Sequence, residues 1–228
     1  MNPLIVNNLT KIFKPKTRWF SSKEEAQSLV IDNISFSLNE SEIVGLTGVN
    51  GSGKTTLLHM LIGILTQSSG LIKYFGKEFV ENKNSLPENI AFASSYFKPA
   101  GSLTIMQNLK FFTRIYNMTN EAADKKIDYL ISVFGLSDYK HKKISDLSAG
   151  EANKICILKA FLPDAKIVLL DEPTAFLDIK AAETFRLLVN EQRNKIGTTF
   201  FLTSHNQQDI SELCDRVLYL DQGRLNNN

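Results

Sequence analysis

The stretch that decides the fold of this 228-residue chain is Gly48-Val49-Asn50-Gly51-Ser52-Gly53-Lys54-Thr55. A glycine, four further residues and then Gly-Lys-Thr form a spacing typical of a loop that wraps around phosphate groups. The mostly apolar residues 42–47 before it have the pattern of a buried strand, and residues 54–65 after it have the pattern of a helix. A strand, a glycine-rich turn and a helix in this order are the context that such a loop requires.

The residue types of the loop predict how it would bind a nucleotide. Glycines let several backbone N–H groups point at phosphate oxygens, and the N-terminus of the following helix adds partial positive charge. Lys54 is expected to reach the β- and γ-phosphates, and the Thr55 hydroxyl is expected to ligate Mg²⁺. We therefore expect the phosphates of a nucleoside triphosphate to bind along the loop and the start of the helix, from Gly48 to Thr56.

A second motif lies at the end of another apolar run, Ile167-Val168-Leu169-Leu170-Asp171-Glu172. Its four apolar residues have the pattern of a buried strand, and the strand ends in two carboxylates. Asp171 is expected beside Mg²⁺, as phosphoryl-transfer sites require. Glu172 is placed to polarise an attacking water. Many families share these two motifs, so the motifs predict the chemistry and leave the family open.

Strand-like and helix-like segments alternate along the rest of the chain, which predicts a mostly parallel α/β sheet. Short apolar runs of strand type occupy residues 90–93, 166–170 and 199–203. Helical patterns occupy residues 104–118, 121–134, 151–162, 179–194 and 207–213. The region 96–162 is rich in helix and is expected to form a lobe, whereas the polar segment 14–28 is expected to be a surface loop.

Composition argues against several other classes of protein. With 26 basic and 24 acidic residues, the net charge of +2 gives no strong attraction to nucleic acid. The longest apolar stretch, near residues 57–65, is interrupted by His59 and is far shorter than the roughly 20 residues that cross a bilayer. Residues 1–10 lack the pattern of a secretory signal. Cys156 and Cys214 form no Cys-x-x-Cys pair, so we expect no metal or redox role for them and a reducing, cytoplasmic setting.

Four further motifs, in order, carry a family resemblance. The run Leu147-Ser148-Ala149-Gly150-Glu151 resembles the LSGGQ signature of ATP-binding-cassette (ABC) proteins and departs from it at Ala149 and Glu151. Ala175-Phe176-Leu177-Asp178 resembles the D-loop, and His205 resembles the switch histidine that follows a strand. Residues 215–224 resemble the closing strand pair of the family. The resemblance spans nearly the whole chain. The chain as a whole looks like an ABC transporter ATP-binding protein.

This resemblance implies the fold and the partners. It implies an α/β P-loop NTPase of the ABC type over residues 1–228, with a RecA-like core, an N-terminal β-subdomain and a helical subdomain. Two copies, or one copy and a homologous cassette, would sandwich two ATP molecules with Mg²⁺. The pair would move integral membrane permease subunits from the cytoplasmic face of the membrane.

The resemblance also implies roles for single residues. Ser148 and the Gly150 backbone of one copy would touch the γ-phosphate held by the other copy, with Ala149 and Glu151 beside them and Asp178 in the D-loop. His205 would contact the γ-phosphate and help Glu172 to fix the attacking water.

Two positions leave alternatives open. The family stacks adenine on an aromatic residue near the N-terminus, and Phe13 is the candidate, although it could equally be a core residue; Trp19 and Phe20 are rivals. The family also places a glutamine that helps to hold Mg²⁺ after the strand at 90–93. Ser95 occupies that position, with Ser94 before it, and its hydroxyl is an oxygen ligand of shorter reach.

Three functions compete. The first is the motor subunit of a transporter, and the second is a non-transport cassette ATPase acting on nucleic acid or on ribosomes. The stretch between the phosphate loop and the signature has no sustained heptads, unlike DNA-maintenance members, and only one cassette is present, unlike most ribosome-acting members. The third is a scaffold with weakened hydrolysis, which the intact Lys54, Asp171, Glu172 and His205 disfavour.

The helix-rich region suggests a direction of transport and a docking surface. Residues 100–109, followed by Phe111-Phe112, look like single-cassette subunits of bacterial exporters, which favours export by analogy. A membrane partner is expected to dock around Tyr96, Phe97, Phe111 and Phe112, although Phe111 and Phe112 could instead fill the core of the lobe.

Overall fold

The computed structural model describes residues 2–14, 27–79 and 89–226. The chain divides into two compact units, each built from separate segments. Unit 1 comprises Met1–Glu40, Leu46–Asn84 and Val217–Asn228, and unit 2 comprises Ser41–Gly45 and Ser85–Arg216. Most of the predicted segment 14–28, including Trp19 and Phe20, lies outside the described residues.

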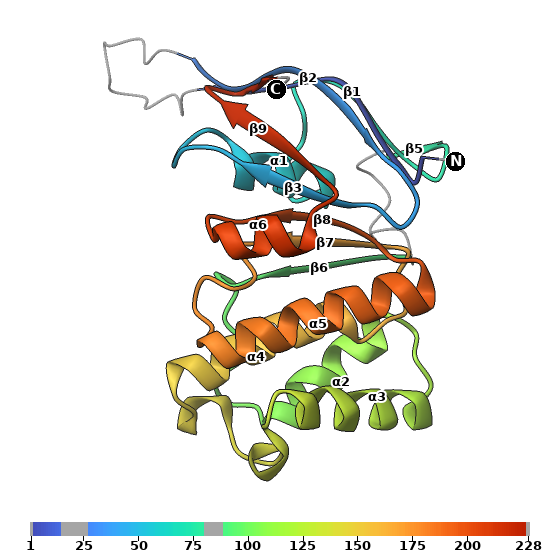
Figure 1. The fold of residues 1–228 in the computed structure, drawn as a ribbon, viewed down its shortest axis with the longest axis vertical. Helices are drawn as coiled ribbons and strands as arrows, with labels where there is room; N and C mark the ends of the chain where they lie inside the picture. The colour runs from blue at the N-terminus through green and yellow to red at the C-terminus, as the bar shows by residue number, and fades with distance from the viewer. Residues whose placement is uncertain (1, 15–26, 80–88, 227–228) are drawn as a thin grey trace, which may run out of the picture. The chain divides into compact units, whose positions relative to one another are not determined.

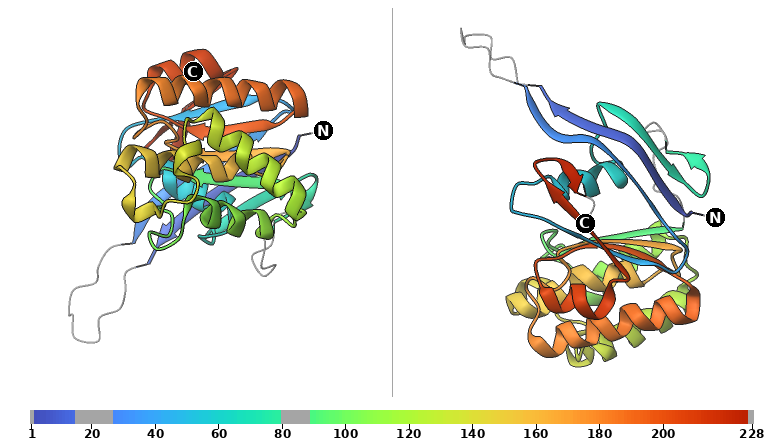
Figure 2. Two further views of the ribbon diagram at one scale, coloured as in Figure 1. Left: turned by 90° about the horizontal axis from the view of Figure 1, so that it is seen from below. Right: turned by 45° about the horizontal axis from the view of Figure 1, so that its top comes forward.

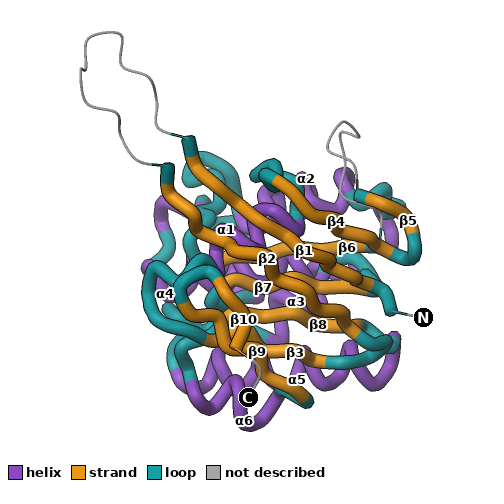
Figure 3. The backbone as a smooth tube through the Cα atoms, turned by 90° about the horizontal axis from the view of Figure 1, so that it is seen from above, coloured by secondary structure: helices purple, strands orange, loops and turns teal. Residues whose placement is uncertain are grey.

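Unit 1 contains a four-stranded antiparallel sheet in the order β2-β1-β4-β5 (Figure 3). The strands are β1 (Leu4–Phe13), β2 (Ser28–Leu38), β4 (Ser69–Tyr74) and β5 (Lys77–Glu78). Alternate residues of paired strands are buried, as in the pairs of Leu4 with Leu38 and Val6 with Phe36. This alternation is the usual sign of a sheet with one apolar face, and it fixes the register of β1 against β2.

Unit 1 also contains the helix α1 (Lys54–Leu61) and the hairpin of β9 (Arg216–Asp221) and β10 (Arg224–Asn226), which joins unit 1 from Val217 onward. The two strands pair antiparallel, so the predicted closing strand pair is confirmed. Helix α1 ends earlier than the predicted residue 65 because the chain turns at Gly63, whose φ is +75°.

Unit 2 contains three parallel strands in the order β8-β7-β6. They are β6 (Ile90–Ser94), β7 (Ile167–Asp171) and β8 (Thr199–Thr203). The first residues of β3 (Ile43–Thr47) adjoin β8, since the backbone N–H of Phe200 donates to the Glu42 carbonyl at 2.9 Å. Strands β7 and β8 are buried at every position, as strands of a parallel sheet usually are.

Helices cover one face of these strands, as Figure 1 and the left view of Figure 2 show. They are α2 (Ile105–Ile115), α3 (Asn120–Val133), α4 (Ala149–Leu158) and α5 (Ile179–Ile196), and the shorter α6 (Gln207–Leu213) contacts α5. Short 3₁₀ turns occupy Ser137–Tyr139, Ile144–Asp146 and Lys159–Phe161. The helices of the predicted lobe share one apolar core with the strands, including Leu109, Ile127, Val168 and Phe200.

The predicted strands and helices from residue 42 onward are all present, with ends that shift by a few residues. Polar caps determine several helix starts: Thr104, Ser148 and Asp178 each accept a backbone N–H from the first turn. Among the described residues, no helix combines the length and apolar character needed to cross a membrane.

Candidate active site

The phosphate loop in unit 1 has a backbone that only glycine can follow at two positions. Gly48 has φ +147° and Gly53 has φ +109°, values that residues with a side chain rarely adopt. A Cβ atom on Gly48 would lie 2.1 Å from the Leu220 carbonyl oxygen, and one on Gly53 would lie 2.7 Å from Ile31 Cδ1. The loop is also held by a hydrogen bond from the Gly223 N–H to the Ser52 carbonyl, at 3.2 Å. The β9–β10 hairpin therefore supports the loop from behind.

The side chains of the loop leave polar groups suited to a phosphate. Lys54 Nζ donates to the carbonyls of Gly48 at 2.8 Å and Val49 at 3.1 Å, which keeps the ammonium group within the loop. Ser52 Oγ is buried and has no hydrogen-bond partner among the described residues. Such an orphaned hydroxyl is costly unless a ligand or water satisfies it. Thr55 is exposed on the first turn of α1, with the half-buried Thr56 after it.

Phe13, the candidate for adenine stacking, ends β1 and is 39% exposed. The Lys11 ammonium lies 5.0 Å from the centre of its ring, within the range of a cation–π contact. Its exposure disfavours a role as a core residue, and its contact with a nucleotide stays a prediction.

The acidic end of β7 in unit 2 is built by hydroxyls from both neighbouring strands. Ser94 and Thr203 lie in register with Asp171. Thr203 Oγ1 donates to Asp171 Oδ1 at 2.9 Å, and Ser94 Oγ donates to Asp171 Oδ2 at 3.3 Å. Asp171 is 2% exposed, and a buried carboxylate requires such donors. Its two oxygens are oriented at the carboxyl ends of parallel strands, where α/β folds place their ligands.

Glu172 and His205 meet directly after β7 and β8. The His205 backbone N–H donates to Glu172 Oε2 at 3.1 Å, and His205 Nε2 lies 3.4 Å from Glu172 Oε1. Glu172 has a left-handed backbone, with φ +49°, and its N–H donates to Thr203 Oγ1 at 3.0 Å. Residues with a side chain hold such a conformation only where their surroundings fix it, and this happens often at active sites. The geometry thus pairs a candidate base with a partly exposed imidazole.

Ser95, the predicted metal ligand, is 4% exposed and follows β6. Its hydroxyl donates to the carbonyl of Glu172 at 2.8 Å and lies 3.3 Å from that of Pro173. Ser94, rather than Ser95, contacts the Asp171 carboxylate. If Ser95 binds a metal, it would do so with the lone pairs of its hydroxyl oxygen, because its proton already forms the hydrogen bond to the Glu172 carbonyl. A metal role for Ser95 stays a prediction.

The signature residues lie at the N-terminus of α4. Ser148 Oγ accepts the N–H of Glu151 at 3.3 Å, and Glu151 Oε2 accepts the N–H of Ser148 at 2.8 Å, which forms a capping box. Ser148 Oγ also donates to Glu151 Oε2 at 2.7 Å, and this hydrogen bond, with the one from the Ser148 N–H, lowers the pKa of Glu151. Ser148 and Ala149 are exposed, and Gly150 is half-buried. The carboxylate at Glu151 thus has a local structural role that a glutamine could also fill.

Asp178, in the predicted D-loop, caps α5 and contacts α4. Its Oδ1 accepts the N–H of Ala181 at 2.8 Å, and its Oδ2 lies 3.3 Å from Lys154 Nζ. The Ala181 hydrogen bond, and after it the Lys154 charge, lower the pKa of Asp178. The signature helix and the D-loop are therefore joined within unit 2.

Sequence reasoning missed the hydroxyls that support Asp171. The sequence motifs do not include Thr203 as a site residue, and they give Ser94 only as the neighbour of Ser95. A signal was present, because both residues end an apolar strand run at the position where Asp171 ends its own. In parallel strands such ends lie side by side.

A phosphate loop between a strand and a helix, together with a buried strand that ends in Asp171 and Glu172, defines the class of P-loop nucleoside triphosphatases. The comparisons with known proteins agree with this class. Residues 31–175 match the family described as ABC transporter. The chain is 35% identical to the uncharacterized ABC transporter ATP-binding protein MJ1023 of Methanocaldococcus jannaschii, over 98% of this chain and 76% of that protein.

Two further comparisons extend the match. The chain is 28% identical to the spermidine/putrescine import ATP-binding protein PotA of Bacteroides fragilis, over 96% of this chain and 45% of PotA, so it spans under half of that relative. A solved dimeric structure of the ATP-binding cassette MJ0796 with ADP and phosphate has a TM-score of 0.83, 22% identity and coverage of 98% of this chain and 97% of that one. At this identity, the structural likeness establishes the fold.

The chain belongs to the ABC transporter family and is an ATP-binding cassette of that family. The predictions of the family, the fold class and an ATPase cassette are thereby confirmed. The roles of the single site residues stay predictions.

Proposed function

We propose that this chain is the ATP-hydrolysing subunit of a transporter and works on the cytoplasmic face of a membrane with separate membrane-spanning subunits. The observation that carries the hydrolytic part is the pairing of Glu172 with His205 beside the buried Asp171. Glu172 would accept the proton of the attacking water, and His205 would orient that water and the γ-phosphate. Lys54 and the loop N–H groups would hold the phosphates and stabilise charge on them.

Mg²⁺ is the metal we propose, because each candidate ligand, taken by itself, offers a hard oxygen. Thr55 offers an exposed hydroxyl, and Asp171 offers a carboxylate already oriented by two hydroxyls; hard oxygens of this kind are the ligands that Mg²⁺ prefers. When bound, the metal would neutralise the charge of the β- and γ-phosphates. Ser95 is proposed only as a weaker contributor, because its hydroxyl already donates to a backbone carbonyl.

A second cassette completes the proposed mechanism. The exposed Ser148 and the Gly150 backbone, at the N-terminus of α4, are available to touch a γ-phosphate held by another copy or by a homologous cassette. ATP would then hold the two cassettes together, and hydrolysis would let them separate. We expect the isolated chain to be mainly monomeric without ATP.

The docking surface proposed for a permease lies on unit 2 after β6. Tyr96, Phe97 and Phe111 are 60%, 44% and 58% exposed, whereas Phe112 is half-buried against the core. The alternative that Phe111 fills the core is therefore wrong. An apolar pocket of about 660 Å³ opens at this surface, lined by residues including Tyr96, Pro99, Ile144 and Phe176, and is suited to apolar side chains of the partner.

Site-specific photo-crosslinking would test the proposed partner. A photoreactive amino acid at Tyr96 is expected to capture a multi-span membrane protein in cells that make the whole transporter. The control is the same probe at Leu187, which is 71% exposed on α5. Capture of ribosomal protein or DNA from Tyr96 would favour the non-transport alternative, and equal capture from both positions would contradict this docking surface. The direction of transport, with export favoured by the sequence, stays a prediction, and we assign no substrate.

A further inference from the structure

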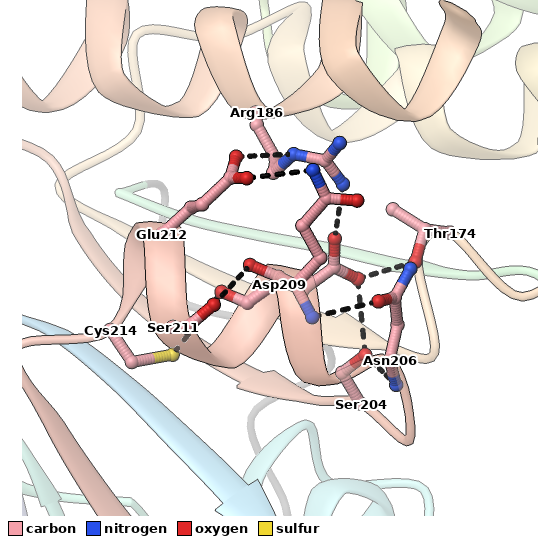
Figure 4. A network of polar contacts seen from close by, with 9 residues as sticks. Thr174, Arg186, Ser204, Asn206, Asp209, Ser211, Glu212 and Cys214 are labelled. Carbon is pink, nitrogen blue, oxygen red and sulfur yellow. Dashed lines mark hydrogen bonds and ion pairs between the residues drawn. The ribbon is translucent and has the colours of Figure 1, made fainter. Parts of the chain in front are cut away.

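A buried ion pair in unit 2 is linked by hydrogen bonds to the segments that carry the candidate catalytic residues. Arg186 on α5 and Asp209 on α6 are 4% and 0% exposed, and Arg186 Nη1 lies 2.9 Å from Asp209 Oδ1 (Figure 4). The Nε atom of Arg186 also lies 2.9 Å from Glu212 Oε2. Burying two charges is costly, and an apolar pair of similar size often gives equal or greater stability. The pair therefore calls for an explanation other than stability.

The second oxygen of Asp209 supplies that explanation. Its Oδ2 accepts the hydroxyl of Thr174 and, at 3.1 Å, the hydroxyl of Ser204 (Figure 4). Thr174 is two residues after Glu172, and Ser204 directly precedes His205. One carboxylate thus holds the segment that follows the candidate base and the segment that carries the imidazole.

Ser204 extends this arrangement around His205. While its hydroxyl donates to Asp209, the same oxygen accepts the N–H of Asn206 at 3.0 Å. The Ser204 hydroxyl therefore links the residue after His205 to the one before it and is itself bonded to Asp209, and the His205 N–H donates to Glu172 Oε2. Glu172 thus joins the two segments through the His205 N–H, and Asp209 joins them through the hydroxyls of Thr174 and Ser204.

We propose that Asp209, held in place by Arg186, is a positioning residue for ATP hydrolysis that sets the placement of Glu172 and His205 through Thr174 and Ser204. This inference rests on the proposed roles of Glu172 and His205. Asp209 contacts the hydroxyls of Thr174 and Ser204 and is proposed to act on the reaction only through them. Its effect comes from orientation, since a misplacement of about 1 Å can lower a rate by about a hundredfold.

The sharpest test changes the hydroxyl of Thr174 and leaves the ion pair intact. Thr174→Val removes only the hydrogen bond to Asp209, and Thr174→Ser keeps it. We expect Thr174→Val to lower kcat about tenfold with KM for ATP unchanged, because orientation is lost and binding is not. Thr174→Ser is expected to restore most of kcat.

The matched control is Thr198→Val. Thr198 is also fully buried and also donates its hydroxyl, at 2.9 Å to the Ala165 carbonyl, but it directly precedes β8, at the opposite end of that strand from Ser204. The Thr198→Val variant should lower Tm much as Thr174→Val does, and it should leave kcat unchanged. Equal kcat values for Thr174→Val and Thr198→Val would overturn the proposal and make the network purely structural.

A double variant separates this inference from the proposed function. If Thr174 acts through Glu172, adding Thr174→Val to Glu172→Gln should leave the residual single-turnover rate nearly unchanged, since residues that act as a unit are not additive. A further tenfold loss would overturn the proposal. If Glu172→Gln alone hydrolyses ATP normally, the proposed role of Glu172 fails and the inference fails with it. If Glu172→Gln is slow while Thr174→Val keeps the wild-type kcat, the inference alone fails.

Discussion

The phosphate loop of unit 1 and the acidic end of β7 in unit 2 hold their polar groups in different ways. The loop uses the backbone of consecutive residues, and even the Lys54 ammonium bonds to carbonyls of its own loop. The end of β7 uses side chains from distant parts of the sequence, such as Ser94, Thr203 and Asp209. A backbone site depends on whether the chain can follow one path, whereas a side-chain site depends on whether several strands arrive in register. Substitutions in the two regions are therefore expected to impair ATP binding and hydrolysis in different ways.

The largest effect is expected in the loop. Lys54→Ala removes the charge that offsets the β- and γ-phosphates, so we expect kcat/KM for ATP to fall by about a thousandfold, with most ATP binding lost. Equilibrium binding of a fluorescent ATP analogue and steady-state hydrolysis would measure this. Lys77→Ala, in the exposed strand β5 of the same unit, is the control and should change neither. Near wild-type affinity and rate for Lys54→Ala would rule out this loop as the nucleotide site.

The acidic end of β7 should separate binding from hydrolysis. Glu172→Gln is expected to keep ATP binding and slow hydrolysis by about a hundredfold or more, the scale of a lost general base. Because ATP then persists, pairs of cassettes should also persist, and light scattering with ATP would detect them. Glu183→Gln, an exposed change on α5, serves as the control. A Glu172→Gln protein that hydrolyses normally and never dimerises would defeat the assignment.

A smaller effect is expected at the signature, which combines a helix N-terminus with side-chain caps. Glu151→Gln keeps an oxygen that can accept the Ser148 N–H and removes a negative charge from the proposed γ-phosphate contact. We expect ATP-driven dimerisation to tighten by about fivefold, from the loss of one weak repulsion in a partly hydrated interface. Sedimentation at several salt concentrations would measure this, since the gain should shrink as salt screens charge. Unchanged dimerisation at low salt would contradict a trans contact here.

The same residue gives a pH dependence with a defined sign. The pKa of Glu151 is lowered by hydrogen bonds from Ser148. The contribution of this capping box to stability is therefore complete above the ordinary pKa of a glutamate and is lost as pH falls through the lowered value. Thermal unfolding of wild type and Glu151→Gln should converge at low pH, because glutamine does not titrate. A difference that grows on acidification would show that the cap is not the cause.

The smallest effect is expected at Ser95. Ser95→Gln supplies a longer oxygen ligand, and Ser95→Ala removes the hydroxyl that donates to the Glu172 carbonyl. We expect the Mg²⁺ concentration for half-maximal hydrolysis to shift by about threefold, downward for Gln and upward for Ala. Because Ser95 is buried, Tm is measured first to separate crowding from metal binding. Superimposed Mg²⁺ titrations of the three proteins would show that Ser95 has no metal role.

Features encoded in neighbouring residues were predictable from the sequence. The phosphate loop, the strands β6 to β8 and the helix starts near residues 104 and 179 depend on spacing within a few residues. The pairing of Glu172 with His205 was also expected, because the family resemblance supplied it. Residues that depend on register were not found: Thr203 becomes a partner of Asp171 only when β8 aligns with β7. The Arg186–Asp209 pair was equally hidden, because charged residues on an amphipathic helix usually face water.

The support of the phosphate loop by the β9–β10 hairpin has a consequence for how the protein is made. A ribosome completes Lys54 on the order of ten seconds before it reaches Gly223, whose N–H bonds to Ser52 and whose carbonyl accepts the N–H of Asp32. Until then, the nascent chain contains the whole nucleotide motif but lacks the hairpin that contacts Gly48 through Leu220 and Ser52 through Gly223. The growing polypeptide should therefore be unable to capture ATP during most of its synthesis, and nucleotide can stabilise it only after residues 217–226 have emerged.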